Sequence, residues 1–239
     1  MGTGSHLFPR AGCGRFGMNS GKHKLAQPDP DDVPKAVINR LSLYLRELQH
    51  LLRNGKTTIS SSQLGRLLGF TDAQVRKDLT CFGHFGHPGI GYRCEELVSA
   101  IRRILGTDRV WTVALFGVGN LGRALLGYKG FAAKGFQIVA AFDADVRKSG
   151  EAIDGVRVHP MDRLDEVVRR QQIQLAMITV PAPAAQSVAD LAIAAGVSGI
   201  VNFAPVTLSV PQDVSLVGVD LATELEQISF SVANRLASR

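Results

Sequence analysis

The chain has 239 residues, which is enough for one large domain or two ordinary ones. Apolar residues make up 45% and charged residues 20%, close to the globular average, which argues against disordered, collagen-like and disulfide-scaffold classes. No stretch approaches 18 uninterrupted apolar residues, so no membrane partner is expected. Three cysteines without a CxxC pair argue against a disulfide framework, and the first residues lack a signal-peptide pattern. We therefore expect a cytoplasmic protein.

The positive charge is concentrated in the first part of the chain. Residues 1–105 hold 15 Lys and Arg against 8 Asp and Glu, whereas residues 106–239 hold 12 against 13. A basic module joined to a near-neutral one suggests that the basic module binds a polyanion. A solvated basic surface is the alternative.

The N-terminal part predicts an arm followed by a helix. We expect residues 1–33 to form a disordered arm, with Asp32 as an N-cap and Pro34 in the first turn of the helix. Apolar residues such as Leu41, Leu45 and Leu48 then recur at helical spacing up to Asn54. The sequence predicts one amphipathic helix here.

Two short helices and a glycine-rich ribbon follow. Ser60–Gln63 and Thr71–Gln74 both match a capping box, and each opens a short helix, the first of which stops at Gly69. This arrangement predicts a helix-turn-helix. Residues 82–92 contain four glycines, which is typical of a tight β-ribbon or wing, and residues 95–105 return to helical spacing. We place a winged-helix domain at 34–106.

The second part alternates strands with helices. Apolar strands are expected at 112–116, 137–142, 175–180, 199–202 and 215–219, with helices after residue 122 and over 184–195. This alternation predicts an α/β domain at 107–220, with a Rossmann-like, doubly wound parallel sheet. Residues 221–239 form an amphipathic helix that either covers the sheet or reaches a second subunit.

A GxGxxG motif carries the main ligand prediction. Gly117, Gly119 and Gly122 follow a strand, open a helix and precede Asp143 at the end of the next strand. In this context glycines allow the backbone to approach a pyrophosphate, and the carboxylate accepts the ribose hydroxyls. Asp143 favours NAD(H) as cofactor because a carboxylate repels a 2′-phosphate, although the nearby Arg147 and Lys148 leave NADP(H) open.

The expected ligand loops lack a group for chemistry. Residues 179–186 and 202–206 contain no side chain that titrates near neutrality, whereas a dehydrogenase needs a proton donor beside the nicotinamide. The site is therefore interpreted as binding the dinucleotide without reacting it, and no enzyme activity is expected. An oxidoreductase that uses Tyr128 or a residue from another subunit remains the alternative. The candidate cofactor contacts are Gly117, Val118, Gly119, Asn120, Leu121, Gly122, Asp143, Thr179, Val180, Pro181, Asn202 and Phe203.

The second short helix has the composition of a DNA-reading helix. Val75 and Leu79 face inward at i, i+4, which leaves Gln74, Arg76, Lys77 and Thr80 for base edges and phosphates. Ser61 and Ser62 are placed to bind phosphate, and His87 belongs to the wing and not to a metal site. A solvated polar helix face is the alternative.

Five segments together resemble one family. They are VRKDL (75–79), FGHFGHPGIGY (82–92), FGVGNLGRALL (116–126), TVPA (179–182) and NFAPV (202–206). In this order they resemble the bacterial redox-sensing transcriptional repressor Rex, over about residues 34–236. The resemblance implies a homodimer with a C-terminal helix exchanged between subunits, which binds double-stranded operator DNA and is released by NADH.

The resemblance also implies residue roles. Arg76 and Lys77 resemble the residues that read the major groove, and Arg46, Tyr128 and Asp220 resemble a switch group in which the Asp changes between the Arg and the partner subunit's Tyr128. The family's wing usually carries Lys or Arg where this chain has His87 and Pro88, and Leu221 stands where an aromatic residue is frequent. A CoA- or nucleotide-responsive regulator is a further alternative, because the glycine-rich turn alone does not name its ligand.

Overall fold

The computed structural model describes residues 33–237. The predicted arm, apart from Val33, and the predicted Asp32 cap lie outside the described residues. The chain divides into two compact units between Asp108 and Arg109. Within the described part, none of the helices has the length and apolar character needed to cross a bilayer.

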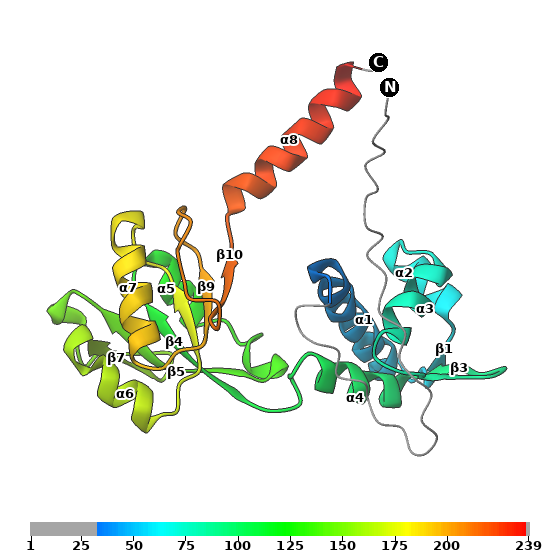
Figure 1. The fold of residues 1–239 in the computed structure, drawn as a ribbon, viewed down its shortest axis with the longest axis horizontal. Helices are drawn as coiled ribbons and strands as arrows, with labels where there is room; N and C mark the ends of the chain where they lie inside the picture. The colour runs from blue at the N-terminus through cyan, green and yellow to red at the C-terminus, as the bar shows by residue number, and fades with distance from the viewer. Residues whose placement is uncertain (1–32, 238–239) are drawn as a thin grey trace, which may run out of the picture. The chain divides into compact units, whose positions relative to one another are not determined.

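The first unit packs four helices around one apolar core, beside a small sheet (Figure 1). Helix α1 (Lys35–Arg53) buries Leu41, Tyr44 and Leu48 along one face. Pro34 precedes this helix as its N-cap and is not in its first turn, because its ψ of 135° is extended. The remaining elements are β1 (Thr58–Ile59), α2 (Ser61–Leu68), α3 (Asp72–Thr80), β2 (Gly86–His87), β3 (Gly91–Arg93) and α4 (Cys94–Ile104).

The two short helices begin differently from each other. The capping box at Ser60–Gln63 is confirmed, since both of its reciprocal hydrogen bonds are present. At Thr71 only half of the predicted box forms: the hydroxyl accepts the Gln74 amide, but the Gln74 side chain bonds elsewhere, to Asp78. Between the helices, Gly69 adopts a left-handed conformation with φ of 76°.

The predicted wing is confirmed as a β-ribbon. Strands β2 and β3 pair antiparallel, with His87 opposite Gly91, and β1 pairs with the other edge of β3. β1 was not predicted, because two residues are too few to show an alternating pattern.

The second unit contains a seven-stranded sheet in the order β10-β9-β8-β4-β5-β7-β6. The pairs from β10 to β7 are parallel, as predicted, whereas β6 pairs antiparallel with β7 as an edge hairpin. The strands are β4 (Trp111–Phe116), β5 (Phe136–Asp143), β6 (Ala152–Ile153), β7 (Val156–Pro160), β8 (Leu175–Ile178), β9 (Gly199–Asn202) and β10 (Ser215–Gly218).

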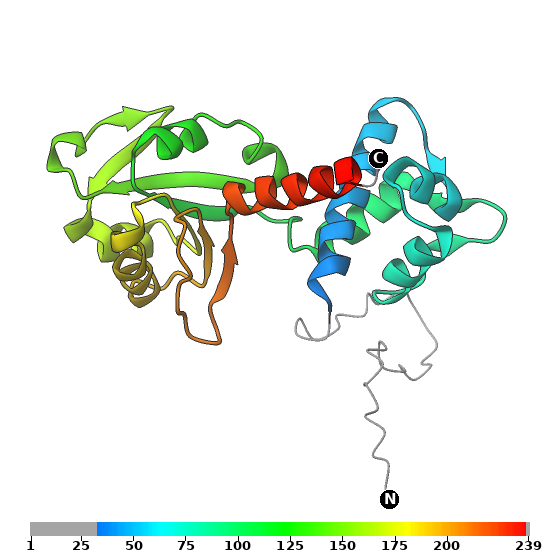
Figure 2. The ribbon, with the colours of Figure 1, turned by 90° about the horizontal axis from the view of Figure 1, so that it is seen from above.

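Helices cover both faces of this sheet. α5 (Asn120–Leu126) lies on one face, and α6 (Leu164–Arg170) and α7 (Ala182–Ala194) lie on the other (Figure 2). The two apolar cores match this division, because Leu126 packs with Val113 and Leu115, whereas Val167 and Ala189 pack with Phe116 and Phe142. α8 (Leu221–Ala237) follows β10, and its side chains from Leu221 to Leu236 are exposed.

Candidate functional site

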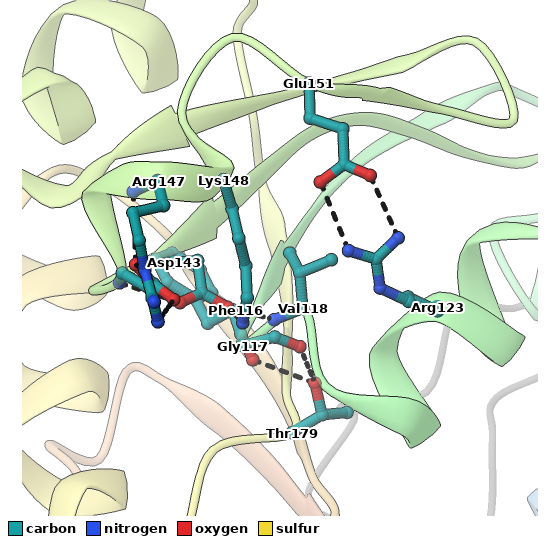
Figure 3. Close-up of polar contacts among 10 residues, drawn as sticks. Phe116, Gly117, Val118, Arg123, Asp143, Arg147, Lys148, Glu151 and Thr179 are labelled. Atoms are coloured by element: carbon teal, nitrogen blue, oxygen red, sulfur yellow. Dashed lines mark hydrogen bonds and ion pairs between the residues drawn. The ribbon is translucent and has the colours of Figure 1, made fainter.

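The strand order of the sheet indicates where a ligand would bind. α5 follows β4 on one face of the sheet and α7 follows the adjacent β8 on the other face, so the chain diverges at the carboxyl ends of these two strands (Figure 1). Ligands of open α/β sheets bind at such a switch point. The Thr179 amide nitrogen donates to the Phe116 carbonyl at 2.8 Å, and its hydroxyl lies 2.9 and 2.7 Å from the Phe116 and Gly117 carbonyls (Figure 3). Thr179 therefore ties the two strand ends together.

The three glycines of the motif have three different environments. Gly117 has φ of 92°, and a Cβ there would lie 2.8 Å from Val180 Cγ1. A Cβ on Gly122 would collide with the Gly117 carbonyl oxygen, so this glycine is required for packing of α5 onto β4. A Cβ on Gly119 would meet no protein atom within 4 Å. The middle glycine thus leaves open space that the fold itself does not need, which fits close approach of a ligand phosphate.

Asp143 ends β5 beside the glycine-rich turn. Its Oδ2 accepts the Val118 amide at 2.7 Å and the Lys148 ammonium at 2.9 Å, and its Oδ1 accepts the Asp145 amide at 2.8 Å. Burial of this carboxyl favours a higher pKa, but these donors outweigh burial, so the pKa of Asp143 lies below its ordinary value. The carboxylate is therefore ionised at neutral pH.

The loop after β5 takes part in three ion pairs. Lys148 reaches back to Asp143, and Glu151 forms a bidentate pair with Arg123 of α5 at 3.0 and 3.1 Å (Figure 3). Arg147, the other cation that left NADP(H) open, pairs with Asp145. Sequence reasoning missed the Arg123–Glu151 pair, since the two residues are 28 positions apart and no motif links them.

The predicted ligand residues after β8 and β9 are mostly apolar or already hydrogen-bonded within the protein. Asn202 is buried. Its side-chain Nδ2 donates to the Ala204 and Val206 carbonyls, and its Oδ1 accepts the Ala204 backbone amide, so it fixes the loop after β9. Val180 and Phe203 pack against the cores on opposite faces of the sheet, and Pro181 is exposed. Val118 is likewise a core side chain, whereas Asn120 and Leu121 are exposed at the start of α5.

A hollow of about 380 Å³ lies between the segment after β9 and strand β10. Asn202 and Asp220 both line it, but the glycine-rich turn does not. A hollow of about 420 Å³ at the amino ends of β4 and β8 is lined by residues such as Thr112 and Gln174, and by none of the predicted cofactor residues.

The predicted DNA-reading residues of α3 divide into two groups. Arg76 and Lys77 are exposed, and the Arg76 guanidinium lies 2.7 Å from Asp72 and 3.3 Å from the Ser61 hydroxyl of α2. Thr80 is also exposed, although its hydroxyl donates to the Arg76 carbonyl. Gln74 instead turns inward, and its amide nitrogen donates to Asp78 at 2.7 Å.

Asp78 is a buried carboxylate that sequence reasoning missed. Arg40 donates to both of its oxygens, at 2.6 and 2.8 Å, and the Tyr44 hydroxyl donates to Oδ2 at 2.8 Å. Burial alone would raise the pKa of Asp78, but these donors lower it overall, and burial together with Asp78 raises the pKa of Tyr44. A signal was available, because position 78 lies on the helical stripe of Val75 and Leu79.

The other predicted contacts lie on the surface of the first unit. The Ser62 hydroxyl lies 2.9 Å from the Ser60 hydroxyl at the start of α2. In the wing, His87 Nε2 lies 3.1 Å from Glu96 of α4, which also accepts from Arg93 at 3.3 Å. His87 is therefore next to a carboxylate.

The three predicted switch residues all have exposed positions. Arg46 lies on α1, and the Tyr128 ring packs edge-on against Phe131 with the ring centroids 4.9 Å apart. Asp220 immediately precedes α8, where its carboxylate accepts the Ala222 amide at 2.9 Å and the Thr223 hydroxyl at 3.1 Å. Asp220 thus caps α8, a role that the sequence pattern had not indicated.

Comparisons with known proteins cover both units. Residues 108–206 match a family described as "CoA binding domain", and residues 32–80 match one described as "Putative DNA-binding protein N-terminus". A redox-sensing transcriptional repressor Rex of Desulfitobacterium hafniense is 49% identical, covering 86% of this chain and 98% of the relative. The Rex protein of Carboxydothermus hydrogenoformans is 46% identical, covering 84% and 96%.

Solved structures agree with the sequence relatives. The crystal structure of RSP, a Rex-family repressor, in complex with beta-NAD+ and operator DNA matches with a TM-score of 0.82 and 37% identity, covering 86% of this chain and 94% of RSP. RSP in complex with beta-NADH matches with a TM-score of 0.78 and 36% identity, covering 86% and 96%. From these identities and coverages, the chain belongs to the family of redox-sensing transcriptional repressors named Rex.

Proposed function

We propose that this protein is a transcriptional repressor that binds operator DNA as a homodimer and is released from it when NADH binds. The observation that carries the proposal is the pairing, in one chain, of an exposed Arg76–Lys77 surface on a helix-turn-helix with a Rossmann switch point. Rex relatives named redox-sensing repressors, and RSP structures with operator DNA, NAD+ and NADH, support it. The proposed domains are 34–106 for DNA, 107–220 for NAD(H) and 221–239 for exchange between subunits.

The proposed dinucleotide contacts lie in the second unit. Open space at Gly119 would admit the pyrophosphate, and the ionised Asp143 would accept the ribose hydroxyls. The nicotinamide ring is cationic when oxidised and neutral when reduced. Apolar residues follow the ends of β8 and β9, with Val180 and Phe203 packed on opposite faces of the sheet and Pro181 exposed; beside the ring, they would penalise the cation and favour NADH. Such differential binding is what allows a ligand to shift a two-state protein.

The DNA contacts are assigned to the first unit. Arg76 and Lys77 would read base edges in the major groove, and Ser61, Ser62 and Thr80 would contact phosphates. Gln74 is a weaker candidate than the sequence indicated, because its amide is engaged by Asp78. A coupling of about 1 to 3 kcal/mol between the sites would change operator affinity roughly 5- to 150-fold.

We also propose that the chain regulates without turning over its ligand. Thr179, Asn202 and the other loop residues at the switch point contain no group suited to proton transfer at neutral pH. Incubation with NADH and candidate carbonyl substrates should leave the absorbance of NADH unchanged. Sustained turnover would contradict this part of the proposal.

One titration tests the repressor proposal. A fluorescent palindromic duplex, enriched from a random library with this protein, is bound to saturation and then titrated with NADH, NAD+, NADPH or coenzyme A while anisotropy is followed. We expect NADH to release the duplex at much lower concentration than NAD+ or NADPH does. Release by coenzyme A alone would favour the second candidate, a CoA-responsive regulator, for which the match of residues 108–206 is the supporting observation. Failure to enrich any duplex would contradict DNA recognition.

A further inference from the structure

The Asp78 carboxylate lies beneath the surface that α3 is proposed to present to DNA, and it takes no part in the proposed DNA contacts. Asp78 is 1% exposed, whereas its neighbours Arg76 and Lys77 are exposed. A carboxylate is rarely buried so completely unless its partners hold it.

Both oxygens of Asp78 are occupied by donors from two helices. Oδ2 accepts Arg40 Nε at 2.6 Å and the Tyr44 hydroxyl at 2.8 Å, and both of these residues belong to α1. Oδ1 accepts Arg40 Nη2 at 2.8 Å and Gln74 Nε2 at 2.7 Å. The arginine thus makes a bidentate contact, the geometry that restricts orientation most strongly. We call Arg40, Tyr44, Gln74 and Asp78 the α1–α3 joint.

Few apolar side chains of α3 are buried. This nine-residue helix buries only Val75, Asp78 and Leu79. Val75 and Leu79 bury one side of α3 in the core, but the hydrophobic effect that favours their burial is non-directional. Hydrogen bonds are directional, and Asp78 stands beside the two apolar residues on the same stripe.

The joint is better suited to orientation than to stability. Desolvation of a buried ion pair offsets most of its attraction, so replacing such a pair with apolar residues is often neutral or stabilising. The joint also competes with a helix cap. The Gln74 side chain bonds Asp78, whereas in a complete capping box it would accept the Thr71 backbone amide. The start of α3 therefore lacks one stabilising hydrogen bond, and Gln74 bonds instead to a carboxylate that also contacts α1.

We infer that Asp78, held by Arg40 and Tyr44, is a positioning residue that sets the orientation of α3 on α1, so that Arg76 and Lys77 can reach base edges. The inference rests on the proposed function. An extended arginine side chain adds about 6 Å to the Cα radius of about 2.3 Å, so a rotation of about 10° about the helix axis moves its guanidinium by roughly 1.5 Å. Such a shift exceeds the range of distances over which a hydrogen bond to a base forms.

Two conservative substitutions on α1 test the joint. Arg40→Lys keeps the charge but loses the bidentate contact, and Tyr44→Phe removes a single hydroxyl from a buried ring. Arg53→Lys is the matched control, because Arg53 is exposed on the same helix and bonds only the Gln49 carbonyl among the described contacts. Each variant is titrated at one fixed salt concentration against the duplex enriched with the wild-type protein and against a scrambled duplex of equal composition.

We expect Arg40→Lys and Tyr44→Phe to bind the enriched duplex about tenfold more weakly, with affinity for the scrambled duplex and for NADH unchanged. Arg53→Lys should behave as wild type. Equal loss on both duplexes, or no loss on either, would overturn the inference, because a purely structural role predicts no change in discrimination. If Arg40→Lys does not fold by circular dichroism, Tyr44→Phe alone decides. A wild-type protein that does not distinguish the two duplexes would overturn the proposed function, and the inference with it.

Discussion

Asp143 is the side chain on which the proposed ligand contact depends most directly. Its carboxylate already accepts the Val118 and Asp145 amides and the Lys148 ammonium, which keep it ionised and oriented. The same donors neutralise part of its charge. If Asp143 accepts the ribose hydroxyls as proposed, Lys148 has two effects: it orients the carboxylate, and it reduces the repulsion that a 2′-phosphate would meet.

Asp143→Ala should weaken NADH binding and make operator release less sensitive to NADH. Loss of hydrogen bonds to a charged acceptor costs about 1.5 to 3 kcal/mol, so the NADH dissociation constant should rise roughly 10- to 150-fold. Fluorescence titration of NADH measures this change, and Asp162→Ala, an exposed carboxylate of the same unit, is the control. An unaltered titration curve would refute the ribose role.

Arg76→Ala should remove most operator affinity while leaving NADH affinity nearly intact. A bidentate contact to a base contributes about 1 to 3 kcal/mol of discrimination, and Arg76 is also held towards Ser61 at the α2–α3 surface. Anisotropy with the enriched duplex measures the loss, and Arg169→Ala on α6 controls for loss of one exposed cation. Equal loss of DNA and NADH binding would contradict the division of roles between the units.

At the scale of an element, the glycine-rich turn separates folding from binding. Gly117 and Gly122 are needed by the fold, the first for its φ of 92° and the second for contact between α5 and the Gly117 carbonyl. Gly119 faces open space. An added methyl group should therefore impair folding at Gly117 or Gly122, but ligand binding at Gly119.

Gly119→Ala should fold with nearly wild-type thermal stability but bind NADH weakly, because the added methyl occupies space needed by the phosphates. Gly122→Ala should instead lower the melting temperature, since its methyl collides with protein backbone. Overpacking of this kind typically costs about 1 to 3 kcal/mol. Calorimetry and NADH titration of the two variants are compared, and the reverse pattern would exclude Gly119 from the ligand site.

The α1–α3 joint makes a second prediction at this scale, in the pH dependence of stability. The pKa of Asp78 is lower in the folded protein than in an unfolded chain, where it is about 3.9. Its ionised form therefore stabilises the fold above about pH 4, and this contribution is lost as the pH falls through the folded value.

Asp78→Asn should lower stability at pH 7 and much less at acid pH. Urea unfolding followed by circular dichroism at several pH values between 3 and 7 gives the difference between wild type and variant. Asp72→Asn is the control, because Asp72 forms an exposed pair with Arg76 on the same helix. A stability difference that stays constant down to pH 3 would show that Asp78 does not act through its charge.

At the scale of the whole molecule, α8 is the element that a single chain leaves incomplete. It exposes a series of large apolar side chains, of which Phe230 is 71% and Leu221 is 70% accessible. The series comprises Leu221, Leu225, Ile228, Phe230, Val232 and Leu236. Exposed apolar surface of this extent is typical of a subunit interface. Its cap, Asp220, is also a proposed switch residue, so a change of partner there would act directly on the start of α8.

Removal of residues 221–239 should convert the dimer into a monomer and reduce operator affinity, because a palindromic site is then contacted by one recognition helix at a time. Sedimentation velocity gives the oligomeric state. Leu225→Glu with Ile228→Glu should have the same effect in the full-length chain, whereas Glu226→Gln, a polar exchange on α8, should remain dimeric. A truncated protein that is still a dimer would place the interface elsewhere.

The sequence by itself determined the local features of this protein. Helical spacing in residues 35–53 and the Ser60–Gln63 cap depend on contacts within a few residues, and the wing and the GxGxxG turn were found from their glycine spacing; the structure confirms these elements. Strand positions followed for the same reason. β7 and α6 were not predicted, although signals were available: Asp154-Gly155 is a hairpin-turn dipeptide before β7, and Leu164, Val167 and Val168 of α6 have helical spacing.

Only the tertiary structure decided where side chains with distant partners point. Gln74 had the spacing of a capping residue, yet Asp78, held by Arg40 and Tyr44, takes its amide. Arg123 of α5 likewise contacts Glu151 of the loop after β5, a partner 28 positions away that no local pattern indicates. The physical reason is that a local pattern records which bonds a residue can form, whereas burial next to a charge from another element decides which bond is strongest.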